Sequence, residues 1–427
     1  MQGETLPCIG MIEMASSFTW LDYSENDRQK MLDILNVSFM EHEARDELGI
    51  GVVRDAFSDM LFPGTSTIQT RARYFLFVPW IYKSLEMKRV PSSRIEARAR
   101  DEEFKLIYAL LDSDDTDGVI GKEAKKNLQR LPSSIYWHGL QSWGIKLDTS
   151  SISDYHRSLD AFYKFSKNSS HSLEETIDGF ERKHNWDPDL PPAPDGFPEK
   201  ASFHLTYDEA CYLKENVLRI WPNTMLAHLL DSKLPRTPVQ FPWQHPICPD
   251  LPQSIKDEIF HARAFSESIY GAALLYNLML VEKAKETKGQ GYDDLAAQYK
   301  EKLEMWADLL SSRQDELKGW DYKEEFWRIV TAQGARPTWR TRQFIQMWLQ
   351  MALSPERARR IAEDDFAGNL IHSREKQLKG KIARLDNPEA LDRWCSDPST
   401  KMAGQLRYRW RPAEKIITDI LLALRGQ

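Results

Sequence analysis

Apolar residues recur every three or four positions along most of this chain, and that spacing is typical of amphipathic helices. Local signals support the pattern. Thr206 precedes the run YDEACYLKENVL, and Glu209 stands three residues after it, so the two side chains predict a capping box. Alternation of period two with β-branched residues is confined to short runs such as 200–205. The pattern predicts a predominantly α protein with little or no β-sheet.

Other polar residues mark further helix ends. Side chains that cap helices stand directly before several apolar runs, and two of them are followed by a proline, which suits the first helical position. The last helix is expected after Pro412, and Gly426 is a natural stop for it. The further predicted caps are Ser24 with Asp27, Ser254 with Asp257 before a helix over 255–286, Ser354 before Pro355, and Asn387 before Pro388.

Two proline-rich passages interrupt the helical pattern. Residues 185–199 (NWDPDLPPAPDGFPE) carry five prolines and are expected to be extended, because proline lacks an N–H and disfavours helix before it. Residues 234–252 are expected to pack through Phe241 and Trp243. A chain of 427 residues is long for one core. We therefore predict an N-terminal extension (1–17) and two packed helical domains (18–184 and 206–427, the second with a basic tail) joined by a Pro-rich linker (185–205).

The longest apolar run covers residues 269–281 and is interrupted by Asn277. A membrane span needs about 20 apolar residues, so this run predicts a buried helix and no membrane partner. The first residues lack the basic and apolar regions of a signal peptide, and a cytoplasmic location is expected. The four cysteines are far apart with no CxxC pair, which argues against disulfides and zinc.

The net charge of −7 disfavours binding of nucleic acid over the whole surface, but the charge is uneven. Residues 321–427 hold 20 Lys and Arg against 14 Asp and Glu. A basic end on an acidic protein permits local contact with a polyanion. The 14 tryptophans allow large cores or aromatic contact surfaces.

The most distinctive segment of the N-terminal half covers residues 54–82 (RDAFSDMLFPGTSTIQTRARYFLFVPWIY). A turn at Pro63-Gly64 is expected to precede a helix capped by a hydroxyl side chain. The helix N–H groups, the hydroxyls and the arginines together suit a phosphate. The alternative is a capped helix that packs its aromatic side on the core and exposes its arginines. The candidate anion-binding residues are Arg54, Thr65, Ser66, Thr67, Gln69, Arg71 and Arg73.

A second candidate site lies in the basic C-terminal region, where arginines alternate with aromatic residues. Such a pattern suits a groove that binds a polyanion by charge and stacking. The alternative is a half-buried segment whose arginines pair with the acidic front half of the chain. The candidate nucleic-acid-binding residues are Arg374, Lys376, Lys379, Lys381, Arg384, Arg407, Tyr408, Arg409, Trp410 and Arg411.

Two acidic motifs resemble metal sites without completing them. Residues 112–121 (DSDDTDGVIG) have the spacing of a calcium loop, but Ser113 and Ala124 stand where the first carboxylate and the closing Glu belong. His42-Glu43 lacks a second His one helical turn on. An acidic turn and a charged helix face are the preferred interpretations, and neither a metal nor a cofactor is predicted.

Residues 122–145 (KEAKKNLQRLPSSIYWHGLQSWGI) predict two helices around a turn at Leu131-Pro132. This spacing resembles a DNA-binding helix-turn-helix, but we prefer a helical hairpin with Trp137, Leu140 and Trp143 buried. No Walker loop, GxGxxG or GxSxG pattern occurs in the sequence. Such absences do not exclude an enzyme, because catalytic groups are recognised by geometry.

Five stretches carry a resemblance to a known family: FTWLDYSENDRQKMLDIL, RDELGIGVVRDAFSDMLFPGTSTIQTRARYFLFVPWIY, GVIGKEAKKNLQRLPSSIYWHGLQSWGI, GAALLYNLML and the tail KGKIARL…LRYRW. They resemble the bacterial family catalogued as domain of unknown function 6361, over nearly the whole chain from Phe18 onward. This family has no assigned activity or site residues, so the resemblance implies none here. It implies a bacterial accessory protein, of the kind found in mobile or phage-defence gene groups.

We therefore expect a non-enzymatic helical adaptor of a bacterial multi-protein system, with phage defence as a setting. It would contact nucleic acid or an acidic protein partner through its C-terminal basic region. The alternatives are a hydrolase or nuclease without a familiar motif and a purely protein–protein scaffold. The first hypothesis depends on basic side chains that face outward, whereas a pocket with converging carboxylates would favour the hydrolase. The oligomeric state is left open.

Overall fold

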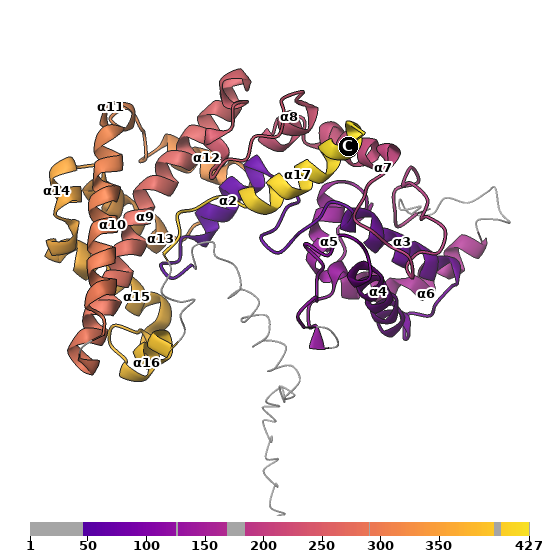
Figure 1. Ribbon diagram of the computed structural model, residues 1–427, viewed down its shortest axis with the longest axis horizontal. Coiled ribbons are helices and arrows are strands. Elements are labelled where there is room, and N and C mark those ends of the chain that lie inside the picture. Colours follow the sequence, from indigo (N-terminus) through magenta and orange to yellow (C-terminus); the bar gives the residue numbers. More distant parts are fainter. Residues whose placement is uncertain (1–45, 125–126, 169–183, 290, 397–402, 427) are drawn as a thin grey trace, which may run out of the picture. The chain divides into compact units, whose positions relative to one another are not determined.

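The computed structural model describes residues 46–124, 127–168, 184–289, 291–396 and 403–426. Within these residues every regular element is a helix, and no strand occurs (Figure 1). The predicted α-helical fold class is confirmed. The N-terminal part of the described chain forms the helices α2 (Gly51–Leu61), α3 (Tyr74–Met87), α4 (Ile95–Leu111), α5 (Pro132–Ser142) and α6 (Ile152–Asn168).

Eleven further α-helices follow the Pro-rich passage at residues 185–199 in the described part of the chain. They are α7 (Tyr207–Ile220), α8 (Met225–Asp231), α9 (Gln253–Lys288), α10 (Asp293–Ser312), α11 (Gln314–Leu317), α12 (Glu325–Ala332), α13 (Trp339–Ala352), α14 (Pro355–Arg359), α15 (Asp365–Lys379), α16 (Pro388–Ser396) and α17 (Trp410–Leu424). Short 3₁₀ helices cover Pro242–Gln244, Cys248–Asp250, Ile361–Glu363 and Gly380–Ile382.

The long helix α9 organises the second half of the chain, because α10, α13, α15 and α16 all pack on it. Figure 1 shows α9 and α10 side by side. Two tryptophans fasten neighbours to it: Trp306 Nε1 donates to Glu267 O at 2.8 Å, and Trp348 Nε1 donates to Ser268 O at 2.9 Å. By length and composition α9 would also be able to cross a membrane, but 83% of its most apolar window is buried in the protein. The predicted buried helix is confirmed.

The described residues, from 46 onward, belong to one compact unit. Helix α2 packs on α9 and α12, and α17 packs on α7 and α8. Where α2 meets α12, the ring centre of Phe57 lies 5.9 Å from that of Phe326. It also lies 5.6 Å from the ring centre of Tyr408, which precedes α17. The division into domains at 18–184 and 206–427 stays a prediction.

Several predicted helix ends are confirmed. Thr206 and Glu209 form the expected capping box, Asn387 Oδ1 accepts from Ala390 N at 3.0 Å, and Gly426 adopts a left-handed φ of +70° after α17. The N-terminal extension 1–17, the Ser24 cap and His42-Glu43 lie outside the described residues.

Other predicted boundaries are wrong. Helix α9 starts after Pro252 rather than at a Ser254 cap, and α17 starts at Trp410, two residues before Pro412. The described residues of 122–131 contain no α-helix, so the first helix of the expected hairpin is missing there; Trp137, Leu140 and Trp143 are buried as predicted. Proline is compatible with the first turn of a helix, so it marks a start only to within a few residues.

Candidate functional site

The Thr65 hydroxyl, expected to cap a phosphate-binding helix, instead stabilises a turn, and the Ser66 hydroxyl is buried without a hydrogen-bond partner among the described residues. Thr65 Oγ1 donates to Phe62 O at 2.6 Å. The Gln69 side chain accepts from Ser66 N at 3.1 Å and donates to Gly64 O at 3.1 Å. Thr67 lies half-buried in the same turn. Helix α3 begins only at Tyr74, with Arg73 as its first flanking residue, so the prediction of a helix start at residues 65–67 is wrong.

Arg71 and Arg73 of this segment are buried. The alternative prediction, a capped helix with exposed arginines, is therefore also wrong for these two residues. Arg71 Nε donates to Asp419 Oδ2 at 2.9 Å, and its Nη1 lies 2.5 Å from Asp115 Oδ2. Arg73 Nη2 lies 2.7 Å from Glu209 Oε1. Burial raises the pKa of Asp419 although Arg71 favours its carboxylate. These guanidinium groups hold distant parts of the chain together.

Three basic residues on and after α15, Arg374, Lys379 and Arg384, form an internal network. Arg374 is buried and donates to Leu48 O at 2.8 Å and Gly49 O at 3.1 Å. Lys379 pairs with Glu47, and Arg384 Nη1 lies 2.9 Å from Glu47 Oε1. Burial alone would raise the pKa of Glu47, but the charges of Arg384 and Lys379 lower it. This network fastens residues 47–49 to α15.

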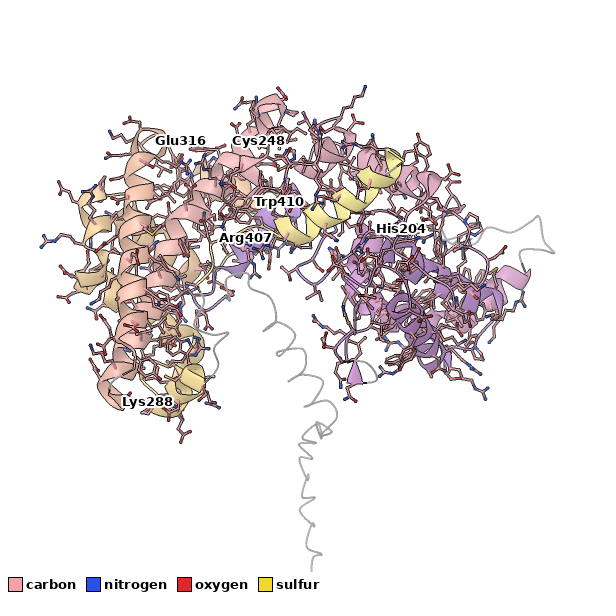
Figure 2. All side chains as sticks on the ribbon, viewed as in Figure 1. His204, Cys248, Lys288, Glu316, Arg407 and Trp410 are labelled. Carbon is pink, nitrogen blue, oxygen red and sulfur yellow. The ribbon has the colours of Figure 1, made fainter. Side chains whose placement is uncertain are left out.

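The alternating Arg/aromatic segment is a structural junction. Tyr408 and Arg409 both adopt left-handed backbone angles (φ +54° and +62°), which cost about 1–2 kcal/mol each for residues with a Cβ. Their side chains hold this conformation: Tyr408 Oη donates to Ala262 O at 2.6 Å, and Arg409 Nη1 lies 2.5 Å from Asp59 Oδ1. Figure 2 labels Arg407 and Trp410 at the start of α17. Trp410 Nε1 donates to Val239 O at 2.9 Å.

The remaining basic candidates are more open to solvent. Arg54 lies beside Asp55 at 3.1 Å, and Arg407 lies over the Phe241 ring at 5.7 Å. Lys376 is exposed and lies 3.1 Å from Asp386. Lys381 and Arg411 are exposed. The structure therefore does not bring the predicted basic residues into one open surface, and their binding of nucleic acid stays a prediction.

A cleft of about 690 Å³ lies among the described residues, and no sequence pattern predicted it. Three chain segments line it. A backbone bridge between Lys146 and Trp186 brings the first two together, with Leu147 N donating to Asn185 O at 3.0 Å. We call this cleft the acidic cleft; its lining residues are Gln141 on α5, then Gly144, Lys146, Leu147, Asp148 and Thr149 after that helix, Asp187 and Asp189 in the proline-rich passage, and Tyr212, Glu215, Asn216 and Arg219 on α7.

A lysine with no exposed side-chain surface supports one wall of the acidic cleft. Lys146 Nζ lies 2.6 Å from Asp148 Oδ2. It also lies 5.1, 4.9 and 5.8 Å from the ring centres of Trp137, Tyr155 and Trp186. A cation on aromatic faces is stabilised by their quadrupoles, more strongly when it is removed from water. We call these three rings the Lys146 cage. The cage stabilises the buried charge of Lys146, and the ion pair with Lys146 positions Asp148 at the cleft.

A half-buried glutamate, Glu86, lies behind these rings. Glu86 Oε1 accepts from Asn185 Nδ2 at 2.9 Å, from Trp186 Nε1 at 3.0 Å and from the Tyr155 hydroxyl. Burial raises the pKa of Glu86 even though these donors and Lys146 favour its charged form. The Glu86 carboxyl thus orients two of the three rings, Tyr155 and Trp186, through hydrogen bonds to the Tyr155 hydroxyl and to Trp186 Nε1. These bonds restrict the movement of the rings around Lys146.

The opposite wall carries a carboxylate–phenol pair. Asp187 is buried, and its Oδ2 accepts from Tyr212 Oη at 3.0 Å. Burial, with the charge of Asp187 beside it, raises the pKa of Tyr212. The phenol therefore stays a donor to the carboxylate. Asp187 Oδ1 also accepts from Asp189 N at 3.1 Å, which orders the loop.

The charges of the acidic cleft are unequal. Four carboxylates (Asp148, Asp187, Asp189 and Glu215) and two cations (Lys146 and Arg219) line it. Lys146 is engaged by Asp148, and Arg219 Nη2 donates to Asn216 Oδ1 at 2.7 Å. Asp189 and Glu215 are exposed. The arrangement suits a cationic group that also forms hydrogen bonds. In the described part of the chain no group of three or more Asp, Glu, His or Cys side chains is placed to hold a metal ion.

Sequence reasoning missed these residues because they come from three segments that only the fold brings together. Asp187 and Asp189 lie within the passage interpreted as a linker. One local signal in the sequence was the glycine at position 144. In the structure Gly144 follows α5 with φ +67°, and a Cβ there would lie 2.6 Å from Ile220 Cδ1. A glycine after a helix marks a sharp turn, and sharp turns often border sites.

The described part of the chain is helical and contains a polar cleft lined by acidic residues. Its family follows from comparison with known sequences. The chain belongs to the family of unknown function DUF6361, whose model matches residues 15–423. No curated protein and no solved structure matches it.

Proposed function

We propose that the protein is a helical adaptor that holds a basic segment of a partner protein in the acidic cleft. One observation supports this most directly: the exposed carboxylates Asp189 and Glu215 lie at a cleft whose two cations already contact Asp148 and Asn216. A volume of about 690 Å³ accommodates one or two long side chains. Lysine or arginine side chains match the charge and the hydrogen-bonding capacity of this lining.

The setting is a bacterial multi-protein system, with phage defence among its forms. This part of the proposal rests on the family resemblance. The contact of the C-terminal basic region with nucleic acid or an acidic partner also remains a proposal, supported by the exposure of Lys381 and Arg411. A hydrolase at the acidic cleft is the second candidate, because Asp187 is buried beside Tyr212 and can act on a polar group bound there.

Fluorescence anisotropy tests the adaptor proposal with the full chain and a labelled decapeptide rich in lysine. Binding should weaken as salt rises. The double substitution Asp189→Asn/Glu215→Gln should weaken it about fivefold, since each exposed ion pair contributes a fraction of a kcal/mol to about 1 kcal/mol. The matched control is Glu301→Gln/Glu304→Gln, two exposed acids of α10.

Equal weakening by the control pair would show binding to the overall negative charge and would contradict the proposal. A labelled DNA oligonucleotide is titrated in parallel. DNA binding without peptide binding would contradict the adaptor proposal for the acidic cleft and would favour nucleic-acid binding by the C-terminal basic region. Turnover of an ester or glycoside probe that Asp187→Asn abolishes would establish the hydrolase instead.

A further inference from the structure

A small apolar groove lies beside α17, separate from the acidic cleft. We call it the α17 groove. Its apolar lining includes Leu229, Leu234, Trp410, Ile417, Leu421 and Leu422. Its cavity volume is about 50 Å³, several times the roughly 10–15 Å³ that one water needs. A space of this size suits a single apolar side chain rather than a whole helix.

Arginines surround the α17 groove. Arg236 and Arg425 line it together with Glu414. Burial raises the pKa of Glu414, although the charges of Arg236 and of the nearby Arg411 oppose this. All three arginines are exposed. Arg425 Nη2 donates to Leu234 O at 2.5 Å, which uses one of its five donors. The rim is therefore complementary to carboxylates.

Two polar groups inside the α17 groove add hydrogen-bonding capacity. Glu414 Oε1 is buried and has no hydrogen-bond partner among the described residues. A buried acceptor without a donor is costly, so an occupant that supplies an N–H or O–H is favoured. His245 accepts from Ile247 N through Nδ1 at 3.2 Å, and burial lowers the pKa of its ring. The neutral ring then carries its proton on Nε2.

We infer that the α17 groove is a docking site for an acidic peptide segment of a partner, anchored by one apolar side chain. The anchor fills the groove, carboxylates on either side of it meet the three arginines, and a backbone N–H of the segment donates to Glu414. Small pockets that bury one anchor side chain carry much of the energy of such interfaces. This site does not depend on the acidic cleft, whose occupant has the opposite charge.

The test uses the full chain and a fluorescein-labelled decapeptide of Asp and Glu with one central Leu. Anisotropy should report saturable binding. A peptide with Ser in place of Leu should bind about tenfold more weakly, because the buried apolar area is lost. Arg236→Glu should weaken binding about fivefold through charge reversal at the rim. The matched control Arg98→Glu removes an exposed arginine of α4 that does not line the groove and should leave binding unchanged.

Thr418→Phe provides a second variant, because a larger side chain at this lining position should block the anchor without altering the rim charge. Circular dichroism checks that each variant is folded. Equal binding of the Leu and Ser peptides, or tighter binding of a single-stranded RNA of ten nucleotides, would show a surface that responds to charge alone and would overturn the inference. Absence of peptide binding at millimolar concentration would overturn it as well.

Discussion

Glu103 is a carboxyl held almost without contact with water. Its two oxygens accept from Ser133 N and Oγ, each at 2.8 Å, so it caps α5 from the neighbouring helix α4. Burial raises the pKa of Glu103 to about 7, although the Ser133 bonds oppose this. The folded protein therefore keeps a proton on Glu103 at pH values where the unfolded chain has lost it.

This carboxyl predicts a loss of stability as the pH rises. Its contribution is complete below the unfolded pKa of about 4.5, decreases through the interval up to about 7 and is constant above it. The difference amounts to about 3 kcal/mol. Urea unfolding at pH 5 and pH 8 should show that wild type loses about this much more than Glu103→Gln, which does not titrate. Equal losses of stability in both proteins would contradict the raised pKa of Glu103.

Arg71 and Arg73 show why single residues misled the sequence analysis. Arginine is seldom buried unless it is paired, so exposure was the natural expectation. Their partners Asp419 and Glu209 are 348 and 136 residues away in the chain. Nothing near Arg71 in the sequence indicates Asp419. Burial of a charge depends on a partner that only the fold supplies.

At the scale of helices, the contact between α9 and α10 depends on a missing side chain. A Cβ on Gly271 would lie 2.4 Å from two atoms of the Trp306 ring, far inside van der Waals contact. The helices approach closely because Gly271 leaves room for this ring. The same residue is unfavourable for the helix itself, since Gly costs about 1 kcal/mol relative to Ala.

Gly271→Ala should therefore destabilise the protein by about 1–3 kcal/mol, because the overpacking exceeds the gain in helix propensity. The matched substitution is Gly368→Ala in α15, where the nearest atom to the added Cβ is Met279 Cε at 4.0 Å. That change should be neutral or should stabilise by up to about 1 kcal/mol. Thermal unfolding of both variants measures the difference. Similar Tm changes of the same sign would contradict the packing argument.

At the scale of the whole molecule, α17 joins parts of the chain that are far apart in sequence. It packs on α7 and α8, and its Asp419 accepts from Arg71 and from Ala72 N at 3.0 Å. The Arg409 pair with Asp59 connects the start of α17 to α2. The last helix therefore stabilises the fold through buried charges as well as through its apolar face.

The Arg71–Asp419 pair predicts a non-additive result. Arg71→Leu leaves a buried carboxylate without its main partner and should cost about 3–5 kcal/mol. The double substitution Arg71→Leu/Asp419→Leu removes both charges and should cost clearly less than the sum of the two single changes. Urea unfolding of the four proteins completes the cycle. Additive costs would show that the two side chains stabilise the fold independently.

The helical class, the capping box at Thr206, the buried apolar run in α9 and the buried aromatic face of α3 could all be predicted from the chain, because they follow from periodicity and local hydrogen bonding. The pairing of the charges and the positions of the cavities could not be predicted in this way. The acidic cleft, the Lys146 cage and the α17 groove each join segments distant in sequence. Contacts of that kind depend on how helices pack, and packing leaves no local pattern in the chain.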